Sequence, residues 1–280
     1  MGNMYHIYRN AATNAISLVD MVEFTTSFDD VSVGLPAGAY VTFRTYGGNN
    51  AFHLKAHIDR LLCTMRVAII SYSQITDFIR RSLSQFLRQP SGQDRRIRMI
   101  IPFTDWNELY ILEENLMIPE PQDYENGVIV VTGQYERSEP DRKQTSFISE
   151  SLELRKRINS FVNEVLLVDR NGRLLEGLSS NLFLVKDGTI FTAGAGVLEG
   201  VTRKIVLEVC NQFTIPIEFT AVRLKDISSC DEAFLSSTSR GVLPVVKIDQ
   251  QVIGKGIPGE ITRRVMVGFA ARIDEGLEEF

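Results

Sequence analysis

The sequence is poor in the residues that build disulfide frameworks and metal sites. It has 280 residues but only three histidines and three cysteines, Cys63, Cys210 and Cys230. The cysteines are far apart and odd in number, and no Cys-x-x-Cys pair occurs, which argues against a disulfide framework and a thiolate metal site. The histidines are not spaced with carboxylates as metal ligands would be. We expect free thiols in a reducing compartment and no bound metal.

The sequence also lacks an excess of positive charge and long apolar runs. With 30 Lys and Arg against 35 Asp and Glu, the net charge is -5, which argues against nucleic acid as the main partner. No apolar run reaches the roughly 18 residues that span a bilayer. The stretch from Met1 to His6 leads into no apolar signal segment. We therefore expect a cytoplasmic protein that binds no membrane.

Length and composition indicate a globular protein of two domains. Hydrophobic residues make up 44% of the chain and charged residues 23%, as in ordinary soluble proteins. The length allows one large or two modest domains. Pro119–Asp123 has the composition of a linker. We predict a boundary there, with domains over residues 1–120 and 125–280.

Many hairpins with a few interspersed helices indicate an α+β fold rather than a doubly wound parallel sheet. Strands are predicted from runs of β-branched and aromatic residues, and helices from apolar positions three and four apart. The main predicted strands lie at 40–46, 96–101, 109–112, 127–132, 164–168, 182–185, 189–192, 215–219, 233–235 and 243–248. The predicted helices lie at about 55–65, 73–88, 147–160, 202–213, 224–229 and 259–276. No element is assigned to residues 1–30.

The stretch from Glu176 to Arg203 carries the strongest chemical signal. Glu176-Gly-Leu-Ser-Ser-Asn181 places a carboxylate and an amide at the edge of an apolar strand. Further on, Gly200-Val-Thr-Arg203 opens a helix, whose first N–H groups, hydroxyl and positive dipole end suit a phosphate. A buried anion and a phosphate cradle in one segment favour a phosphorylated, nitrogen-bearing cofactor.

The order of several motifs resembles that of a known family. The motifs are His57-Ile-Asp-Arg60-Leu, a lysine before a helix, Glu164 at the start of an apolar strand, Glu176 to Asn181, Gly200 to Arg203, and Ser236-Ser237-Thr238 followed by Pro244-Val245. In this order, over roughly residues 38–250, they resemble the class IV aminotransferases. These are the fold-type IV enzymes that use pyridoxal 5′-phosphate, and they include branched-chain and D-amino acid aminotransferases and aminodeoxychorismate lyases.

The resemblance implies an architecture and an assembly. The expected fold has a small α/β N-terminal domain and a larger, β-rich C-terminal domain that binds the cofactor. The expected assembly is a homodimer, with the site near the subunit interface and a small-domain loop reaching across. Cofactor and partners would be pyridoxal 5′-phosphate, an amino acid and an oxo acid, without nucleic acid or membrane.

The resemblance also assigns a catalytic lysine. An amine is needed to bind the cofactor aldehyde covalently and to move the proton at the substrate α carbon. The family places this lysine about one helix before the residue that matches Glu164, and Lys143 has that spacing. Arg142 cannot serve because a guanidinium stays protonated. Lys156 is the only other lysine nearby in the sequence that could take this role. Lys143 could also be no more than a solvated surface lysine.

Cofactor contacts follow from the same motifs. Glu176 would pair with the pyridine nitrogen, keeping it protonated so that the ring accepts electrons. Each of these residues also has a purely structural explanation. Glu176 could be a surface glutamate, and Arg60 could form a salt bridge with Asp59. Thr202 could serve only as a helix cap, and Leu198 could pack in the core without contacting a cofactor ring. His57 is interpreted as structural. The expected cofactor-binding residues are Arg60, Glu176, Asn181, Leu198, Val201, Thr202, Ser237 and Thr238.

Departures from the family pattern fall where the family reads its substrate. Tyr40 is followed by Val41-Thr42 where a glutamate is common, and Phe147 stands where branched-chain members place a tyrosine. Small residues and an acid usually follow the last phosphate segment, but here the sequence is Ser239-Arg240-Gly241. Two convergent arginines would favour an acidic substrate, whereas an aliphatic pocket would favour branched-chain substrates. The candidate substrate-binding residues are Tyr40, Arg44, Arg98 and Arg240, and the plain alternative for each arginine is a salt bridge or solvent.

Three functions remain open at this point. The first is an aminotransferase that moves an amino group between an amino acid and a 2-oxo acid, with D or L stereochemistry undetermined. The second is a lyase of the aminodeoxychorismate type, releasing pyruvate and an aromatic amine, with Thr42 as a proton donor. The third is a family member that has lost the cofactor and would be colourless. The intact Lys143, Glu176 and Thr202 favour an enzyme.

Overall fold

The computed structural model describes residues 1–66, 69–88 and 92–280, and these divide into two compact units. The N-terminal unit contains Met1–Met117, Arg142–Glu150 and Asp274–Phe280. The C-terminal unit contains Ile118–Asp141 and Ser151–Ile273. The sequence placed one boundary near residue 120. In the structure, two later segments, 142–150 and 274–280, also group with the N-terminal unit, because Gln144 forms a bridge with Ala39 and residues 277–279 pair with residues 50–52.

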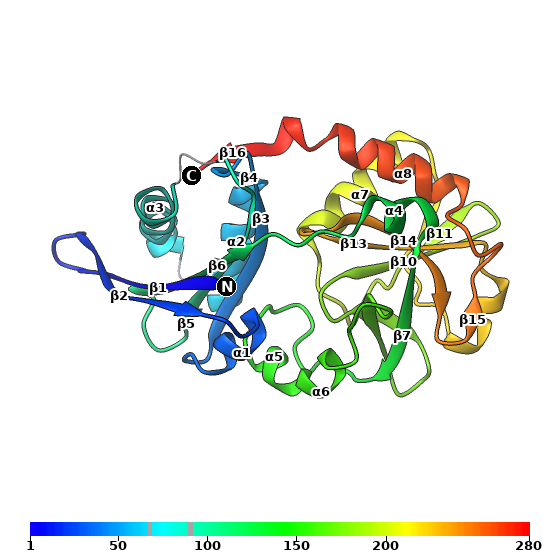
Figure 1. Ribbon diagram of the computed structural model, residues 1–280, viewed down its shortest axis with the longest axis horizontal. Helices are drawn as coiled ribbons and strands as arrows, with labels where there is room; N and C mark the ends of the chain where they lie inside the picture. The colour runs from blue at the N-terminus through cyan, green and yellow to red at the C-terminus, as the bar shows by residue number, and fades with distance from the viewer. Residues whose placement is uncertain (67–68, 89–91) are drawn as a thin grey trace. The chain divides into compact units, whose positions relative to one another are not determined.

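The N-terminal unit is built on an antiparallel seven-stranded sheet in the order β16-β4-β3-β5-β6-β1-β2 (Figure 1). Its strands are β1 (Gly2–Arg9), β2 (Ile16–Phe24), β3 (Gly38–Tyr46), β4 (Asn50–Phe52), β5 (Arg95–Pro102), β6 (Glu108–Asn115) and β16 (Leu277–Glu279). Its helices are α1 (Phe28–Val33), α2 (Leu54–Met65), α3 (Ile69–Phe86) and α5 (Ser146–Glu150), with the 3-10 turn η2 (Asp274–Gly276).

The helix α2 packs on β3 through one apolar face. Leu54, Ile58 and Leu61 recur at helical spacing and are fully buried. They meet Val41 and Phe43, which lie on one face of β3 because side chains alternate along a strand. Each such side chain stabilises the fold by about 1.5–3 kcal/mol when it leaves water. This packing fixes the helix that carries His57 and Arg60.

The elements β1, β2 and α1 were not predicted from the sequence. The strand β2 lies at the edge of the sheet and pairs only with β1 among the described residues. Residues 17–23 of β2 are all exposed, so no alternation of buried and polar residues marks the strand. The helix α1 is too short for a helical period, although Ser27 and Asp30 form a capping box at its start.

The C-terminal unit is built on a nine-stranded sheet in which six strands form a closed ring (Figure 1). The ring runs β10-β13-β14-β7-β8-β9 and closes by the pairing of β9 with β10. The strands are β7 (Val128–Gln134), β8 (Glu164–Val168), β9 (Leu174–Gly177), β10 (Asn181–Lys186), β11 (Thr189–Phe191), β12 (Ile217–Glu218), β13 (Glu232–Ser237), β14 (Gly241–Ile248) and β15 (Gln251–Val252). The helical segments are α4 (Pro121–Asn126), α6 (Leu152–Arg155), α7 (Val201–Gln212), η1 (Leu224–Ser229) and α8 (Glu260–Ala271).

The two faces of this sheet carry different sets of side chains. One face holds an apolar core that includes Leu182, Leu235 and Leu243. Residues next to these in sequence point to the other face, as the pleat requires. The helices α7 and α8 pack on β13 or β14 and on each other (Figure 1). The N-terminus of α7 is thereby held close to the end of β13.

Three predicted elements differ from the structure. The supposed linker at Pro119–Asp123 begins α4, because Pro121 occupies the first helical turn and Glu120 with Asp123 forms a capping box. The predicted helix 147–160 is two short helices, α5 and α6, interrupted at the fully buried Ser151. The closing helix ends at Ala271 rather than near residue 276.

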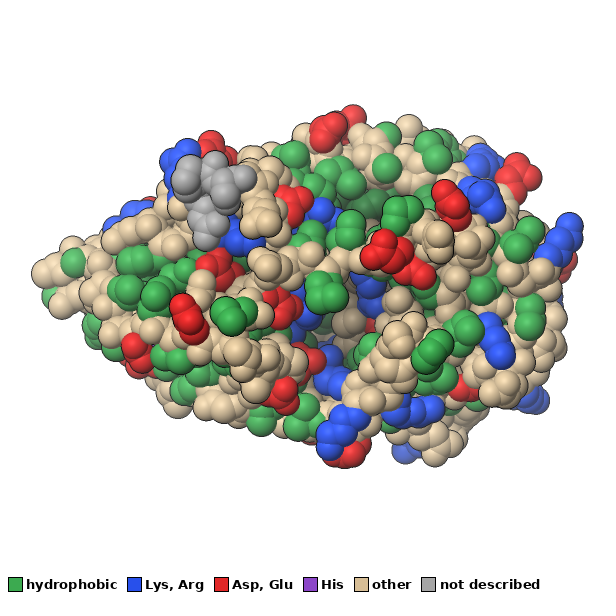
Figure 2. All heavy atoms as spheres, in the orientation of Figure 1, with side chains coloured by type: hydrophobic (Ala, Val, Ile, Leu, Met, Phe, Trp, Pro, Cys, Tyr) green, Lys and Arg blue, Asp and Glu red, His purple; other side chains and the backbone are tan. Residues whose placement is uncertain are grey.

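On the face shown in Figure 2, acidic and basic side chains are interspersed rather than gathered by sign. Within the described ranges, no helix combines the length and hydropathy needed to cross a bilayer.

Candidate active site

Glu176 is a buried carboxylate near the end of β9. The residue is 3% exposed, and its Oε1 accepts a hydrogen bond from Arg137 Nη1 at 2.9 Å. Its Oε2 accepts from Asn181 Nδ2 at 3.1 Å and from the Leu198 backbone N–H at 3.0 Å. A buried carboxylate is tolerated when it is paired and hydrogen-bonded in this way. Three separate segments of the chain therefore fix its two oxygens.

Polar side chains continue from Glu176 across two neighbouring strands. Glu176 of β9 lies opposite Asn181 of β10, and Asn181 lies opposite Ser236 of β13. Directly opposed residues of antiparallel strands point to the same face of a sheet. The Ser236 hydroxyl is buried and has no hydrogen-bond partner within the described part of the chain. An orphaned buried hydroxyl marks a place where a bound molecule or water supplies the partner.

The N-terminus of α7 lies beside this row of polar side chains. A Cβ added at Gly200 would lie 2.2 Å from Asn181 Oδ1, so any larger residue would have to displace the Asn181 amide. As the N-cap residue, Gly200 has no side chain to accept a hydrogen bond, which leaves the first N–H groups of α7 to another acceptor. Thr202 Oγ1 and Thr238 Oγ1 are 3.4 Å apart. Helix N–H groups and two hydroxyls together suit a phosphate.

The predicted residues of the C-terminal unit thus gather around one row of side chains. Leu198 takes part through its backbone, since its N–H binds Glu176 and its carbonyl accepts from Asn181 Nδ2 at 2.8 Å. The residues concerned are Glu176, Asn181, Leu198, Val201, Thr202, Ser237 and Thr238. The Glu176 carboxylate is a hydrogen-bond acceptor, and the helix N–H groups and the hydroxyls are donors. Together they fit pyridoxal 5′-phosphate, which has a ring nitrogen and a phosphate.

Arg240 is held by side chains of the protein. Its Nη2 donates to Glu164 Oε2 at 2.7 Å and to Ser179 Oγ at 2.9 Å. Its Nη1 donates to the Asn163 backbone oxygen at 3.2 Å and to Asn163 Oδ1 at 3.0 Å. Its Nε donates to Ser237 Oγ at 3.1 Å. Every nitrogen of the guanidinium therefore has a partner, as in the salt-bridged alternative that the sequence left open.

Glu164, the acid beside Arg240, is fully buried. Burial raises the pKa of this carboxyl, but the Arg240 charge and hydrogen bonds from Arg240 and Ser179 outweigh burial and hold the pKa below its ordinary value. Moving Arg240 to a substrate would leave this charge buried and unpaired, at a cost of about 3–5 kcal/mol. A substrate contact by Arg240 remains a prediction, and this cost weighs against it.

Lys143, in the N-terminal unit, is held through its backbone by β3 and α2. Its carbonyl accepts from the Tyr40 N–H at 2.8 Å, and its own N–H donates to Thr64 Oγ1 at 3.3 Å. The next residue, Gln144, forms a bridge with Ala39 of β3. The Lys143 ammonium lies 5.1 Å from the centre of the Tyr40 ring. The lysine lies outside any helix or strand and is anchored by the ordered elements β3 and α2.

His57 lies on the same helix as Arg60 and is 1% exposed. Burial holds the pKa of His57 well below its ordinary value, and the nearby charges of Arg60 and Lys143 lower it further. The imidazole is therefore neutral at pH 7. Neither ring nitrogen has a hydrogen-bond partner in the part of the chain that is described. The predicted structural role of His57 is consistent with its contact with Phe43, whose ring centre lies 5.6 Å away.

The other two candidate arginines also have partners within the protein. Arg98 is 3% exposed and donates to Asp29 Oδ1 and Ser32 Oγ, both at 2.8 Å, and to Thr42 Oγ1 at 3.1 Å. These bonds tie α1 to β3 and β5. Arg44 forms an ion pair with Asp94 at 3.1 Å. Contacts of Arg44, Arg98 and Tyr40 with substrate remain predictions.

Sequence reasoning gave no role to Arg137 or Ser179, and it quoted Glu164 only as the start of a strand. Arg137 follows β7, yet its partner Glu176 is 39 residues further along the chain. No local pattern predicts such a pairing. The only signal is an arginine three residues after the end of an apolar strand, near the strand end where sites often form.

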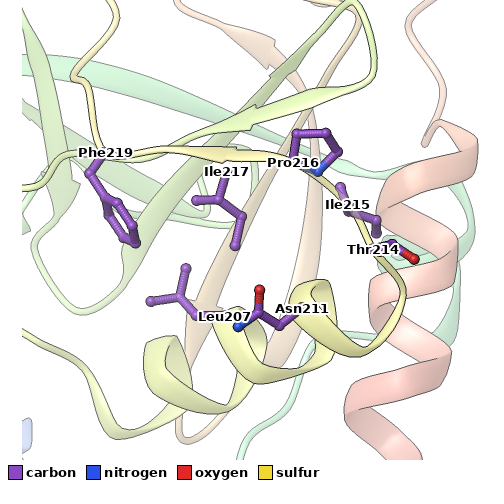
Figure 3. A pocket seen from close by; sticks show the side chains of 7 residues that line it. All are labelled: Leu207, Asn211, Thr214, Ile215, Pro216, Ile217 and Phe219. Carbon is purple, nitrogen blue, oxygen red and sulfur yellow. The ribbon is translucent and has the colours of Figure 1, made fainter.

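A separate pocket of about 380 Å³ lies at the other end of α7. Figure 3 shows Leu207 and Asn211 of α7 facing the segment 214–219 (Figure 3). The lining residues are Leu207, Asn211, Thr214, Ile215, Pro216, Ile217 and Phe219. None of these side chains titrates, so the pocket supplies no acid, base or charge for a reaction.

Thr214 closes the C-terminus of α7 in a left-handed conformation, with φ 54°. A β-branched residue is strained there, whereas glycine is not. We expect Thr214→Gly to raise the free energy of unfolding by about 1 kcal/mol, measured by urea denaturation. Thr220→Gly is the control, because Thr220 is exposed and is not among the positive-φ residues, and it should lower stability. A loss of stability in Thr214→Gly would contradict the assigned strain.

Comparisons with known proteins agree with this arrangement. The family model for amino-transferase class IV matches residues 38–248, which is more than half of the chain. A probable branched-chain-amino-acid aminotransferase of Thermotoga maritima is 29% identical over 88% of this chain and 90% of its own length. A D-alanine aminotransferase of Bacillus licheniformis is 28% identical over 89% of this chain and 92% of its own length.

Solved structures show the same fold. A putative branched-chain amino acid aminotransferase from Thermotoga maritima aligns with a TM-score of 0.74 and 26% identity, over 96% of both chains. A branched-chain amino acid aminotransferase from a T.th. strain, solved with pyridoxamine 5′-phosphate, aligns with a TM-score of 0.76 over 98% of both chains. At 19% identity, this second likeness concerns the fold alone. The predicted α+β, fold-type IV architecture is confirmed.

The curated relatives named above are aminotransferases, so the lyase alternative is not favoured. The predicted enzyme class is confirmed by the family match and by these relatives. The chain belongs to the class IV aminotransferases, a family of pyridoxal-phosphate enzymes, and moves an amino group between an amino acid and a 2-oxo acid.

Proposed function

We propose that the enzyme binds pyridoxal 5′-phosphate through the predicted residues and uses Lys143 as its catalytic amine. When bound, this cofactor supplies an electron-accepting ring that stabilises negative charge at the substrate α carbon. Glu176 holds the pyridine nitrogen, and Asn181 and Leu198 hold Glu176. Arg60, Val201, Thr202, Ser237 and Thr238 bind the phosphate. Lys143 would bind the cofactor aldehyde and move the proton at the substrate α carbon.

The observation that carries the proposal is the buried carboxylate of Glu176. It lies in one row with Asn181 and the orphaned hydroxyl of Ser236. Arg137, Asn181 and Leu198 offset the cost of burying this carboxylate, and a buried charge held in place in this way is typical of a binding site. Its neighbour is a helix start whose N–H groups suit an anion. A ligand with a cationic nitrogen at one end and a phosphate at the other matches this row.

Lys143 suits its role through its position and its chemical type. Its backbone is bonded to Tyr40 and Thr64, and its ammonium lies over the Tyr40 ring. A primary amine, unlike the guanidinium of the adjacent Arg142, can lose its proton and then act as a nucleophile and base.

The names of the relatives suggest two classes of amino donor, branched-chain amino acids and D-alanine. The test is the visible absorption spectrum of the protein with pyridoxal phosphate, before and after single amino acids of each hand. We expect a visible band that one of L-leucine, L-valine or D-alanine bleaches. A band that no amino acid bleaches would return the lyase to consideration. No band with added cofactor would overturn the proposal.

The homodimer remains a prediction from the resemblance, and the cytoplasmic location remains a prediction from the lack of apolar segments in the sequence. Light scattering of the purified protein measures its mass directly. A mass near twice the 31.5 kDa of one chain would support the dimer, and a mass of one chain would contradict it.

A further inference from the structure

We propose that Arg240 is a positioning residue that makes the Ser237 hydroxyl a dedicated hydrogen-bond donor to the cofactor phosphate. The inference rests on the proposed function, since it takes the phosphate to lie between the start of α7 and the turn after β13. It gives Arg240 a task at the cofactor instead of the predicted task at the substrate.

The first step concerns the bonds of one oxygen atom. A serine hydroxyl has two lone pairs that accept and one hydrogen that it donates. Ser237 Oγ accepts from Arg240 Nε at 3.1 Å and from the Arg240 backbone N–H at 3.4 Å. Both lone pairs are then used, and no described residue accepts the hydrogen of this hydroxyl. Ser237 can therefore only donate, and a phosphate has only acceptor oxygens.

The second step concerns what holds Arg240 in place. Its Nη2 is paired with the fully buried Glu164, and the same nitrogen donates to Ser179 Oγ. Ser179 Oγ in turn donates to Glu164 Oε2 at 2.7 Å. Tyr124 OH donates to the Arg240 carbonyl at 2.8 Å. The guanidinium is thus fixed on the side away from Ser237, so its Nε has one direction in which to donate.

The third step concerns the hydroxyl groups close to Ser237. Ser237 is the last residue of β13 and precedes Thr238, whose Oγ1 is 3.4 Å from Thr202 Oγ1 at the start of α7. A hydroxyl that is free to rotate forms a hydrogen bond with a neighbouring hydroxyl or with water as readily as with a ligand. A hydroxyl that is oriented before the ligand arrives costs less entropy on binding. Arg240 therefore raises affinity for the phosphate without touching it.

The test compares pyridoxal phosphate with pyridoxal, which lacks the phosphate. Each protein is freed of cofactor and titrated with each ligand, and the dissociation constants are read from absorbance. The variants are Ser237→Ala, Arg240→Lys and the double variant. Arg240→Lys keeps a cation beside Glu164, but an ammonium on a single stem cannot also reach the other partners. A Glu164→Gln/Arg240→Gln variant removes both charges and serves if Arg240→Lys does not fold.

We expect Ser237→Ala and Arg240→Lys each to weaken pyridoxal phosphate binding about 10- to 100-fold, the effect of a hydrogen bond to a charged group. Pyridoxal binding should stay within about 2-fold. The double variant should be no weaker than Ser237→Ala alone, because Arg240 acts through Ser237. The control is Arg173→Lys, which alters an Arg–Asp ion pair of 2.6 Å on a hairpin of the same unit and should change neither constant.

Three results would overturn the inference: unchanged binding of pyridoxal phosphate, an equal loss for pyridoxal, or multiplying effects in the double variant. The first shows that Ser237 or Arg240 has no such role. An equal loss for pyridoxal means that the variants disturb the fold or the binding of the cofactor ring rather than the phosphate. Multiplying effects in the double variant mean that Ser237 and Arg240 act separately. If the unaltered protein does not prefer pyridoxal phosphate to pyridoxal, the proposed function fails instead, so the two failures can be told apart.

Discussion

Replacing Lys143 by alanine is expected to lower kcat by about 10³-fold or more. The amine both binds the cofactor aldehyde and carries a proton at the α carbon, and general acid–base catalysis alone contributes about 10²–10⁴-fold. Steady-state rates with the best amino donor measure the loss. Lys143→Arg should be as inactive, because a guanidinium remains protonated and does not attack an aldehyde. An activity within 10-fold of the unaltered enzyme would remove Lys143 from the mechanism.

A chemical readout separates this role from a structural one. Borohydride reduces the bond between a lysine and the cofactor, and mass spectrometry then finds the modified peptide. The unaltered protein should carry the cofactor on the peptide that contains Lys143, and Lys143→Ala should carry none. Lys156→Ala is the matched control, since Lys156 is a nearby lysine on the surface whose charge pairs with Glu153. Its modification and rate should not change.

The core strands and long helices could be predicted from the sequence because their buried residues recur with the period of a strand or a helix. The helix α2 buries Leu54, Ile58 and Leu61 at the expected spacing. The strand β2 could not be found this way, since it lies at an edge with nearly all of its side chains exposed. The start of α4 was misread as a linker, because proline both interrupts helices and begins them, and only the capping contacts of Glu120 and Asp123 decide.

Candidate site residues could be predicted where one short segment contains the chemistry. Glu176, Asn181 and Thr202 lie within one stretch, and the structure places them around one row of side chains. Partners that join distant segments could not be predicted. Arg240 looked free in the sequence because Glu164, its partner, is 76 residues away. The same reason concealed Asp29 and Ser32 as partners of Arg98, so arginines that looked available for substrate are tied to the fold.

Replacing Glu176 by glutamine is expected to lower kcat about 10²–10³-fold, the usual effect of losing one charge-stabilising group at a reacting centre. Without the carboxylate, the pyridine nitrogen loses the charge that keeps it protonated. The change also takes the Glu176 charge away from the buried Arg137, and removing one partner of a buried ion pair typically costs about 3–5 kcal/mol of stability. Rates are therefore measured per folded molecule, and Glu176→Gln/Arg137→Gln, which removes both charges of this pair, is made as well.

A second buried ion pair in the same protein serves as the control that separates an effect on the reaction from an effect on stability. Arg95 and Glu113 form an ion pair whose side chains are 5% and 4% exposed, against 6% and 4% for Arg137 and Glu176. Glu113→Gln/Arg95→Gln should therefore change thermal stability about as much as the change at Glu176 and Arg137. Its kcat per folded molecule should stay within about 2-fold, because Glu113 is bonded to Tyr5 and Asn3 and has no task at the cofactor. Equal losses of kcat in both double variants would mean that Glu176 acts through the fold and not on the cofactor.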